Sequence, residues 1–330
     1  MTEPAITDKL DWAEFVQLYW DRRPVLIRGV QPPPFVADEV FAAAVGAREA
    51  EHGGQRAPTA QFTIERTIHG GSDLLLPAAA DRTFDQYEAR LKPVLGDRGY
   101  ALIVSVLHAF DQEMWQRERD FFAGLWEQVG LPLTGAITTM FHGNYDNSPV
   151  GVHKDRFATF MFGLRERKRM RFWAERPWTD PVSTVVDYEQ FLPSSFAVEV
   201  EPGDLLYWPS TYYHVGENCG PTPATSVNIG VPRDEHKVEY ELEDLLADLD
   251  PRLLMLAGGR LNVLAEGIEA PATVEIPADG QLTGRLPGAF EQALRNCREL
   301  SLDQRVGVVS GHRWTTGGFW PAPSPKQTGE

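Results

Sequence analysis

Short runs of apolar and alternating residues dominate the chain between about residue 100 and residue 232. Residues 101–107 are almost wholly apolar and rich in β-branched side chains, a pattern that is typical of a buried strand. Turns rich in Gly and Pro separate many such runs, which favours a small antiparallel barrel or double-sheet roll. The other predicted strands are residues 25–28, 62–66, 136–142, 156–162, 168–173, 197–200, 205–208 and 225–231.

Helical periodicity occurs on both sides of this strand-rich region. Apolar stripes predict helices over residues 8–21, 35–51 and 113–129. After Pro232 the strand pattern stops, and residues 235–250 and 287–300 read as further helices. We therefore expect a mainly β domain with flanking helices over residues 1–234. Residues 235–330 would form a helical C-terminal appendage that caps the barrel or makes a homodimer.

Composition narrows the class of protein. The 330 residues are 42% hydrophobic, yet they hold no apolar run of about 18 residues and no basic, then apolar, N-terminal leader. We expect a cytoplasmic protein that does not span a membrane. The two cysteines, Cys219 and Cys297, are too few for a disulfide framework or a cysteine-based zinc site.

The net charge of -16 bears on partners. It disfavours nucleic acid, because phosphate backbones are bound by clustered Lys and Arg. A local basic patch over residues 165–171 keeps a tRNA substrate open as an alternative. A basic peptide or protein is the partner that this charge favours.

Two histidines and one carboxylate are spaced as metal ligands. His153 and Asp155 open an apolar strand, and residues i and i+2 of a strand project from the same face. His214 comes at the end of a segment that begins with the Pro202-Gly203 turn and continues as the short predicted strand over residues 205–208. Such a set, with open coordination positions, describes the facial triad of non-haem Fe(II) oxygenases. A His-x-Asp pair also arises by chance, so the alternative is surface or core histidines with no metal.

Lys168 gives a separate signal in the next strand. Alternation puts Lys168 on the apolar, inward face, while the neighbouring arginines take the other face. A buried lysine needs an anionic partner. The alternative is a bulge that leaves Lys168 at the rim of the barrel.

Taken in order, these motifs resemble a known family. The chain has Tyr-Trp-Asp-Arg-Arg-Pro-Val-Leu-Ile-Arg-Gly at residues 19–29, then His-x-Asp, then a lysine fifteen residues after the first His, then Pro-Gly-Asp-Leu-Leu-Tyr-Trp-Pro at residues 202–209. Over residues 8–232 it resembles the JmjC and cupin-like 2-oxoglutarate oxygenases, in particular the amino-acid hydroxylase branch with factor-inhibiting HIF and the ribosomal oxygenases. The resemblance implies a double-stranded β-helix (cupin or jelly-roll) fold.

The resemblance also implies roles by position. His153, Asp155 and His214 would hold Fe(II) and form the catalytic centre, where 2-oxoglutarate and O2 react. Lys168 would bind the distal carboxylate of 2-oxoglutarate. Asn228 would lie beside the other end of the co-substrate, and Thr159 would face the metal pair. Thr159 departs from the asparaginyl branch, which tends to have an amide there.

The implied activity is hydroxylation of an amino-acid side chain in a peptide or protein, such as a ribosomal protein or the precursor of a peptide natural product. Two alternatives stay open: a metal-dependent cupin that does not use 2-oxoglutarate, and a non-catalytic binding protein with the same fold. Candidate residues around the entrance, with core packing as their alternative, are Trp208, Tyr212, Tyr213, His108 and His142.

Overall fold

The computed structural model describes residues 4–52, 60–69, 74–132, 135–233 and 317–319. The chain divides into two compact units, one of residues 1–235 with 316–330 and the other of residues 236–315. All described residues belong to the first unit. The expected boundary at residues 234 and 235 and the expected helices over 235–250 and 287–300 lie outside the described residues and stay predictions.

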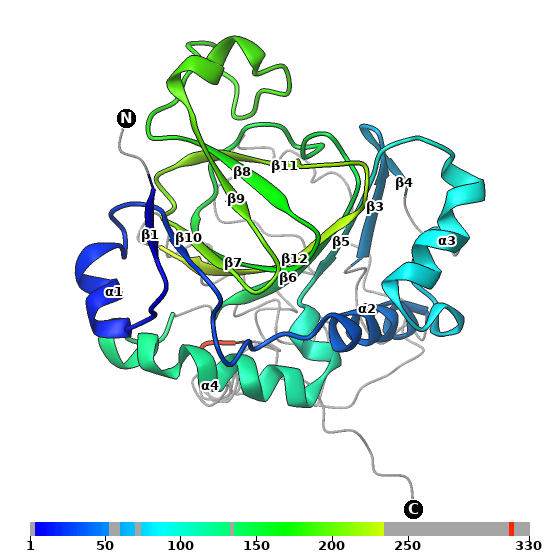
Figure 1. Cartoon of the computed structure of the whole chain (residues 1–330), viewed down its shortest axis with the longest axis horizontal. Helices are drawn as coiled ribbons and strands as arrows, with labels where there is room; N and C mark the ends of the chain where they lie inside the picture. The colour runs from blue at the N-terminus through cyan, green and yellow to red at the C-terminus, as the bar shows by residue number, and fades with distance from the viewer. Residues whose placement is uncertain (1–3, 53–59, 70–73, 133–134, 234–316, 320–330) are drawn as a thin grey trace, which may run out of the picture. The chain divides into compact units, whose positions relative to one another are not determined.

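The described strands form two sheets (Figure 1). Within them β1 and β2 pair in parallel and the other neighbours pair antiparallel. The expected mainly β architecture is confirmed, and the two sheets are consistent with a jelly roll. The larger sheet has the order β1 (Ala5–Thr7), β2 (Val25–Ile27), β10 (Leu205–Trp208), β7 (Phe157–Arg165), β12 (Ala224–Pro232), β6 (Ile137–Gly143), β5 (Tyr100–Ser105), β3 (Ala60–Ile64) and β4 (Thr67–His69), and the smaller has β11 (Tyr213–Asn218), β8 (Lys168–Trp173) and β9 (Phe196–Val200).

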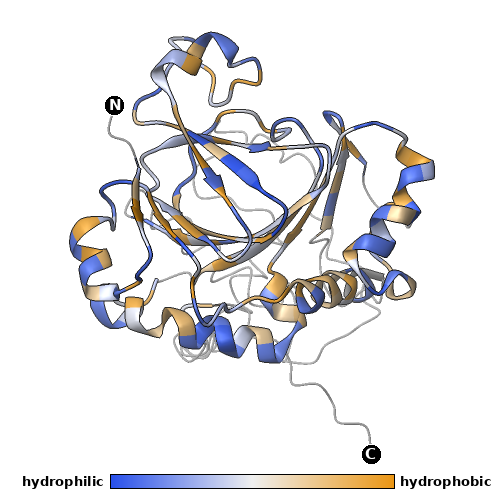
Figure 2. Cartoon of the chain, in the orientation of Figure 1, coloured by the Kyte–Doolittle hydropathy of each residue, from blue (hydrophilic) through white to orange (hydrophobic). Residues whose placement is uncertain are grey.

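Helices α1 (Trp12–Leu18), α2 (Ala37–His52) and α4 (Gln112–Val129) lie against the outer face of the larger sheet (Figure 1). Apolar and polar residues alternate along α4, as expected for a helix with one buried face (Figure 2). Asp111 caps α4 by accepting hydrogen bonds from the backbone N–H groups of Glu113 and Met114. No helix in the described ranges is both long and apolar enough to cross a membrane.

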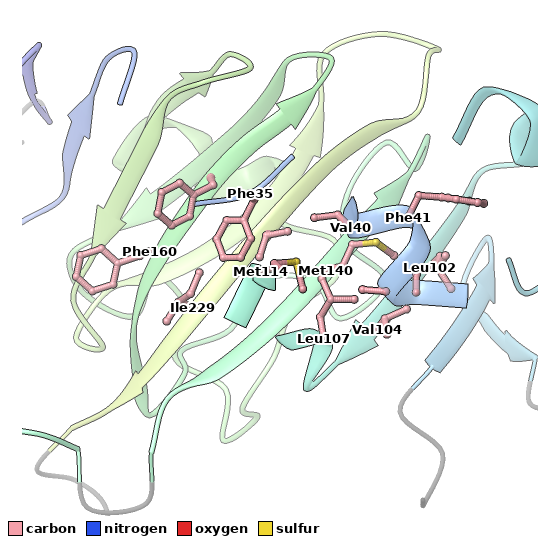
Figure 3. Close-up of a cluster of buried hydrophobic side chains, with 14 of the residues drawn as sticks. Phe35, Val40, Phe41, Leu102, Val104, Leu107, Met114, Met140, Phe160 and Ile229 are labelled. Atoms are coloured by element: carbon pink, nitrogen blue, oxygen red, sulfur yellow. The ribbon is translucent and has the colours of Figure 1, made fainter. Parts of the chain in front are cut away.

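Because side chains alternate along a strand, each central strand of the larger sheet serves two cores. Phe160 of β7 and Ile229 of β12 point to the helices, where they lie in the cluster with Val40 and Met114 (Figure 3). The opposite face packs on the smaller sheet through Met161, Leu206, Trp208, Met170, Phe172 and Val198. The second face is the interior of the barrel, and it carries the candidate site.

Candidate metal centre

His153, Asp155 and His214 come together at one end of the barrel interior. One ligand atom from each side chain lies within 4.8 Å of the others. The Nε2 atom of His153 is 3.6 Å from Asp155 Oδ1, and the Nε2 atom of His214 is 3.5 Å from Asp155 Oδ2. Neighbouring ligands of an octahedral ion at bond lengths of about 2.1 Å lie roughly 3 Å apart. The three donors therefore fit one face of such an ion after small side-chain movements.

The backbone holds the two histidines in place. The N–H group of His153 donates to the carbonyl of His214 at 3.1 Å, and the N–H group of His214 donates back at 2.8 Å. This reciprocal pair joins the loop before β7 to β11, although the two residues are 61 positions apart in the sequence. The expectation had placed His214 at the far end of the strand that follows the Pro-Gly turn, whereas it lies near the start of a separate strand, β11.

Both imidazoles are oriented for metal binding through Nε2. His153 Nδ1 lies 2.9 Å from the carbonyl of Gly151, and His214 Nδ1 lies 3.3 Å from the carbonyl of Tyr212. A carbonyl only accepts hydrogen bonds, so each Nδ1 carries the proton. The lone pair of each Nε2 is then free to face Asp155, and outer contacts of this kind orient the histidine ligands of metalloproteins.

The protonation states agree with this geometry. Burial, assisted by the charge of His214, lowers the pKa of His153 and favours the neutral ring that binds a metal. Burial alone would raise the pKa of Asp155, but its interactions with His214 and, less strongly, with His153 outweigh burial and lower it. The set therefore offers two imidazoles and one carboxylate, the donor chemistry of a divalent iron site.

Lys168 lies inside the barrel, as the alternation predicts. Its side chain is 4% exposed, and the Nζ atom donates to Ser226 Oγ at 3.3 Å. The ammonium also lies 5.2 Å from the ring centroid of Phe141 and 5.5 Å from that of Tyr145. Among the residues that the structure describes, no carboxylate forms an ion pair with it. Within the described part of the chain, the site therefore presents a buried positive charge with no anion beside it.

The arginines of the same strand face outward. Arg169 and Arg171 pair with Glu199 and Glu217 of the neighbouring strands at 2.6 and 2.7 Å. These ion pairs neutralise much of the basic patch that had kept a tRNA substrate open as an alternative.

A cavity of about 350 Å³ connects the metal ligands with Lys168. Thr159 and Asn228 both line it, on β7 and β12. Asn228 Oδ1 has no hydrogen-bond partner within the described ranges, so it can accept from a ligand or from water. A larger hollow of about 900 Å³ between α3 (Phe84–Leu95) and the loop at residues 144–147 contains none of the three metal ligands.

Of the expected entrance residues, the structure brings only Trp208 to the cavity. Tyr213 packs on Trp178 instead, at 5.2 Å between ring centroids. His142 is buried on the outer face of β6, where it bonds to Tyr100 and Thr225. Burial lowers the pKa of His142 to about 3, which keeps the ring neutral.

Comparison with known proteins adds a weak likeness. Neither a protein-family model nor a curated protein matches the sequence. The structure is similar to that of YcfD from Escherichia coli, with a TM-score of 0.45 and 17% identity over 88% of this chain and 68% of that chain. Two further similar structures are of the same protein, YcfD, a ribosomal oxygenase from Escherichia coli. One is in complex with cobalt and 2-oxoglutarate (TM-score 0.44, 16% identity, 89% of this chain and 67% of that chain). The other holds cobalt and succinic acid (TM-score 0.45, 18% identity, 89% and 67%). At these scores the likeness assigns neither a family nor an activity.

Sequence reasoning missed three residues around Lys168. Phe141 of β6, Tyr145 of the following loop and Ser226 of β12 surround the ammonium. Phe141 and Ser226 pair across β6 and β12, so a correct strand register would have placed them on one face. Tyr145 lies in a loop, where no periodic pattern indicates the direction of a side chain.

Proposed function

We propose that the chain is an Fe(II)- and 2-oxoglutarate-dependent oxygenase that hydroxylates an amino-acid side chain of a peptide or protein. The observation that carries this proposal is Lys168. A buried ammonium that has no counter-ion among the described residues shares one cavity with a set of two histidines and a carboxylate. A ligand that is anionic at one end and chelating at the other satisfies both features.

The separation along the strands supports a ligand of that length. Lys168 pairs with Asn218, and Phe172 pairs with His214, so lysine and metal ligand are four residues apart along β8 and β11. Four residues of antiparallel strand extend about 13 Å. A lysine side chain and a five-carbon dicarboxylate span such a distance together. Gly216 lies between them, and a Cβ atom there would stand 3.4 Å from both Lys168 Cε and Met170 Sδ.

The roles of the residues follow from these positions. Bound Fe(II) with 2-oxoglutarate and O2 supplies the oxidation of a C–H bond. His153, Asp155 and His214 would hold the ion on one face and leave the remaining positions for ligands. Lys168 would hold the distal carboxylate, with Tyr145 and Ser226 beside it. Asn228 and Thr159 would contact the end of the co-substrate near the metal.

Binding of 2-oxoglutarate tests this proposal directly. Without oxygen, the protein with Fe(II) and 2-oxoglutarate should develop the charge-transfer absorption of a chelated 2-oxo acid, and admitted oxygen should give succinate. Lys168→Ala should weaken 2-oxoglutarate binding about 10- to 100-fold, because a charge-assisted hydrogen bond contributes about 1.5–3 kcal/mol. His153→Ala should abolish the absorption.

Arg169→Ala is the matched control, since this residue lies on the same strand and faces away from the cavity. It should leave the 2-oxoglutarate affinity unchanged. Metal binding without any charge-transfer absorption would point instead to a cupin that does not use 2-oxoglutarate. Absence of metal binding would leave a non-catalytic binding protein.

A further inference from the structure

The open end of the metal cavity has an apolar lining. Ile137 and Val150 both line the cavity and are 38% and 46% exposed, so both present aliphatic surface to solvent at the cavity. Ile137 begins β6, whereas Val150 comes from the loop that precedes the metal ligands. Two elements distant in sequence thus place exposed aliphatic side chains on one cavity.

Gly230 extends this apolar lining toward the metal ligands. It pairs with Ile137 on one side and with Thr159 on the other. A Cβ atom at Gly230 would lie 3.3–3.4 Å from the ring of Phe157, so the ring covers the glycine backbone. Phe157 also lines the cavity, two residues after Asp155. An aromatic ring and two aliphatic side chains therefore line the cavity together with the candidate metal ligands.

The charged groups of the cavity are already committed. Among the described lining residues, only His153, Asp155, Lys168 and His214 are ionisable at physiological pH. If the proposed function holds, Asp155 and a dicarboxylate together balance a divalent ion and Lys168. An arginine or lysine of a substrate would then enter without a counter-ion, and burial of an unpaired charge is strongly unfavourable.

We infer that the group presented to the metal is an uncharged, apolar side chain, aliphatic or aromatic. This inference rests on the proposed function and specifies its substrate class. The cavity of about 350 Å³ lies at the small end of ligand sites, which suits one side chain beside the co-substrate. A basic peptide stays compatible with this inference only if its basic residues lie outside the cavity.

Paramagnetic broadening by Mn(II) measures which side chain approaches the metal. The protein would be loaded with Mn(II) and 2-oxoglutarate, then mixed in turn with the N-acetyl amides of leucine, phenylalanine, arginine and glutamate at equal concentration. The terminal side-chain protons of the leucine and phenylalanine amides should broaden at least about tenfold more than those of the charged amides. Equal or stronger broadening of the arginine amide, or no broadening of any amide, would overturn the inference.

Val150→Asp places a carboxylate at the open end and should raise the broadening of the arginine amide while lowering that of the leucine amide. Val94→Asp is the control, because Val94 is 47% exposed on α3 and does not line this cavity. The methylene protons of 2-oxoglutarate report on the proposed function in the same samples. Their broadening should be lost in Lys168→Ala, and if the wild-type protein fails to broaden them, the proposed function fails. If they broaden while the arginine amide is preferred, only the substrate class is wrong.

Discussion

Two ionisable residues, Lys168 and Glu118, are buried on opposite faces of the larger sheet. The two faces accommodate them in different ways. Lys168 faces the cavity, where a ligand can supply the missing anion. Glu118 of α4 is fully buried, and its Oε1 atom accepts a hydrogen bond from the Thr138 hydroxyl. Its Oε2 atom has no partner in the described part of the chain. Burial raises the pKa of Glu118 to about 8, so this carboxyl is neutral at physiological pH.

This raised pKa predicts a pH dependence of stability. The folded state holds the proton more tightly than the unfolded chain, whose glutamate pKa is near 4.5. The free energy of unfolding should therefore fall as pH rises from about 4.5 to about 8, and the contribution of Glu118 should be constant above that. Glu118→Gln removes this loss, which amounts to at most about 5 kcal/mol for a shift of this size.

Urea unfolding at pH 5, 6.5 and 8.5 checks this prediction. The Glu118→Gln protein should gain stability relative to wild type as pH rises. Glu127→Gln, an exposed position on the same helix, should follow the wild-type curve. Parallel curves for the wild-type and Glu118→Gln proteins would show that this carboxyl does not change its charge state over the range.

Periodicity alone indicated much of the candidate site at the level of residues. The prediction that His153 lies beside Asp155 assumed a strand, whereas both residues lie in the loop before β7. The alternation of β8 correctly predicted that Lys168 points inward. The convergence of His214 with this pair was predicted, but the reciprocal backbone hydrogen bonds between His153 and His214 were not, because they join segments that are distant in sequence. The apolar open end was missed for the same reason, since Val150 and Ile137 meet only in the folded chain.

At the level of elements, the sequence was most informative where strands are apolar and clearly bounded. The predicted strands over residues 168–173 and 205–208 agree with β8 and β10. Helix α3 was not predicted, although its buried residues Phe84, Tyr87, Leu91 and Leu95 have helical spacing; Pro93 near its end interrupts the pattern. Strand β11 was also missed, since Tyr213–Asn218 contains a glycine and little alternation.

The loop before β7 depends on Gly151, which suggests a prediction at this scale. Gly151 has a φ of +76°, and a Cβ atom there would lie 2.4 Å from the carbonyl oxygen of Val185. Gly151→Ala should therefore push the loop away from Val185 and move the carbonyl that orients His153. Metal affinity should fall about 10- to 100-fold, the range typical of lost outer contacts to a ligand.

Isothermal titration with Mn(II) measures this loss of affinity. Gly96→Ala provides the control, because Gly96 also has a positive φ, +63°, but has nothing within 4 Å of a Cβ atom. This variant should have a lower free energy of unfolding because of backbone strain, but its affinity for Mn(II) should be unchanged. If both variants bind Mn(II) as the wild type does, the loop does not position His153.

At the scale of the whole molecule, the acidic net charge of the chain contrasts with the mostly apolar lining of the cavity. The net charge of -16 is spread over the chain and acts on the approach of a partner through solution. The cavity beside His153 instead has a mostly apolar lining, and only four of its described lining residues are ionisable near physiological pH. The acidic composition therefore bears on the whole partner, whereas under our proposal the cavity would select the single side chain that reaches the metal.

Mn(II) and 2-oxoglutarate should each raise the thermal stability of the protein, and the effect of 2-oxoglutarate should depend on bound Mn(II). A ligand that binds only the folded state at 100 times its dissociation constant adds about 2.7 kcal/mol, which raises Tm by roughly 5 °C in a protein of this size. Mn(II) should produce such a shift, and 2-oxoglutarate should add a further shift only when Mn(II) is present, because chelation requires the ion. In thermal unfolding, His153→Ala should remove both shifts and Lys168→Ala only the second. An equal effect of 2-oxoglutarate with and without Mn(II) would mean that the dicarboxylate binds away from the three metal ligands.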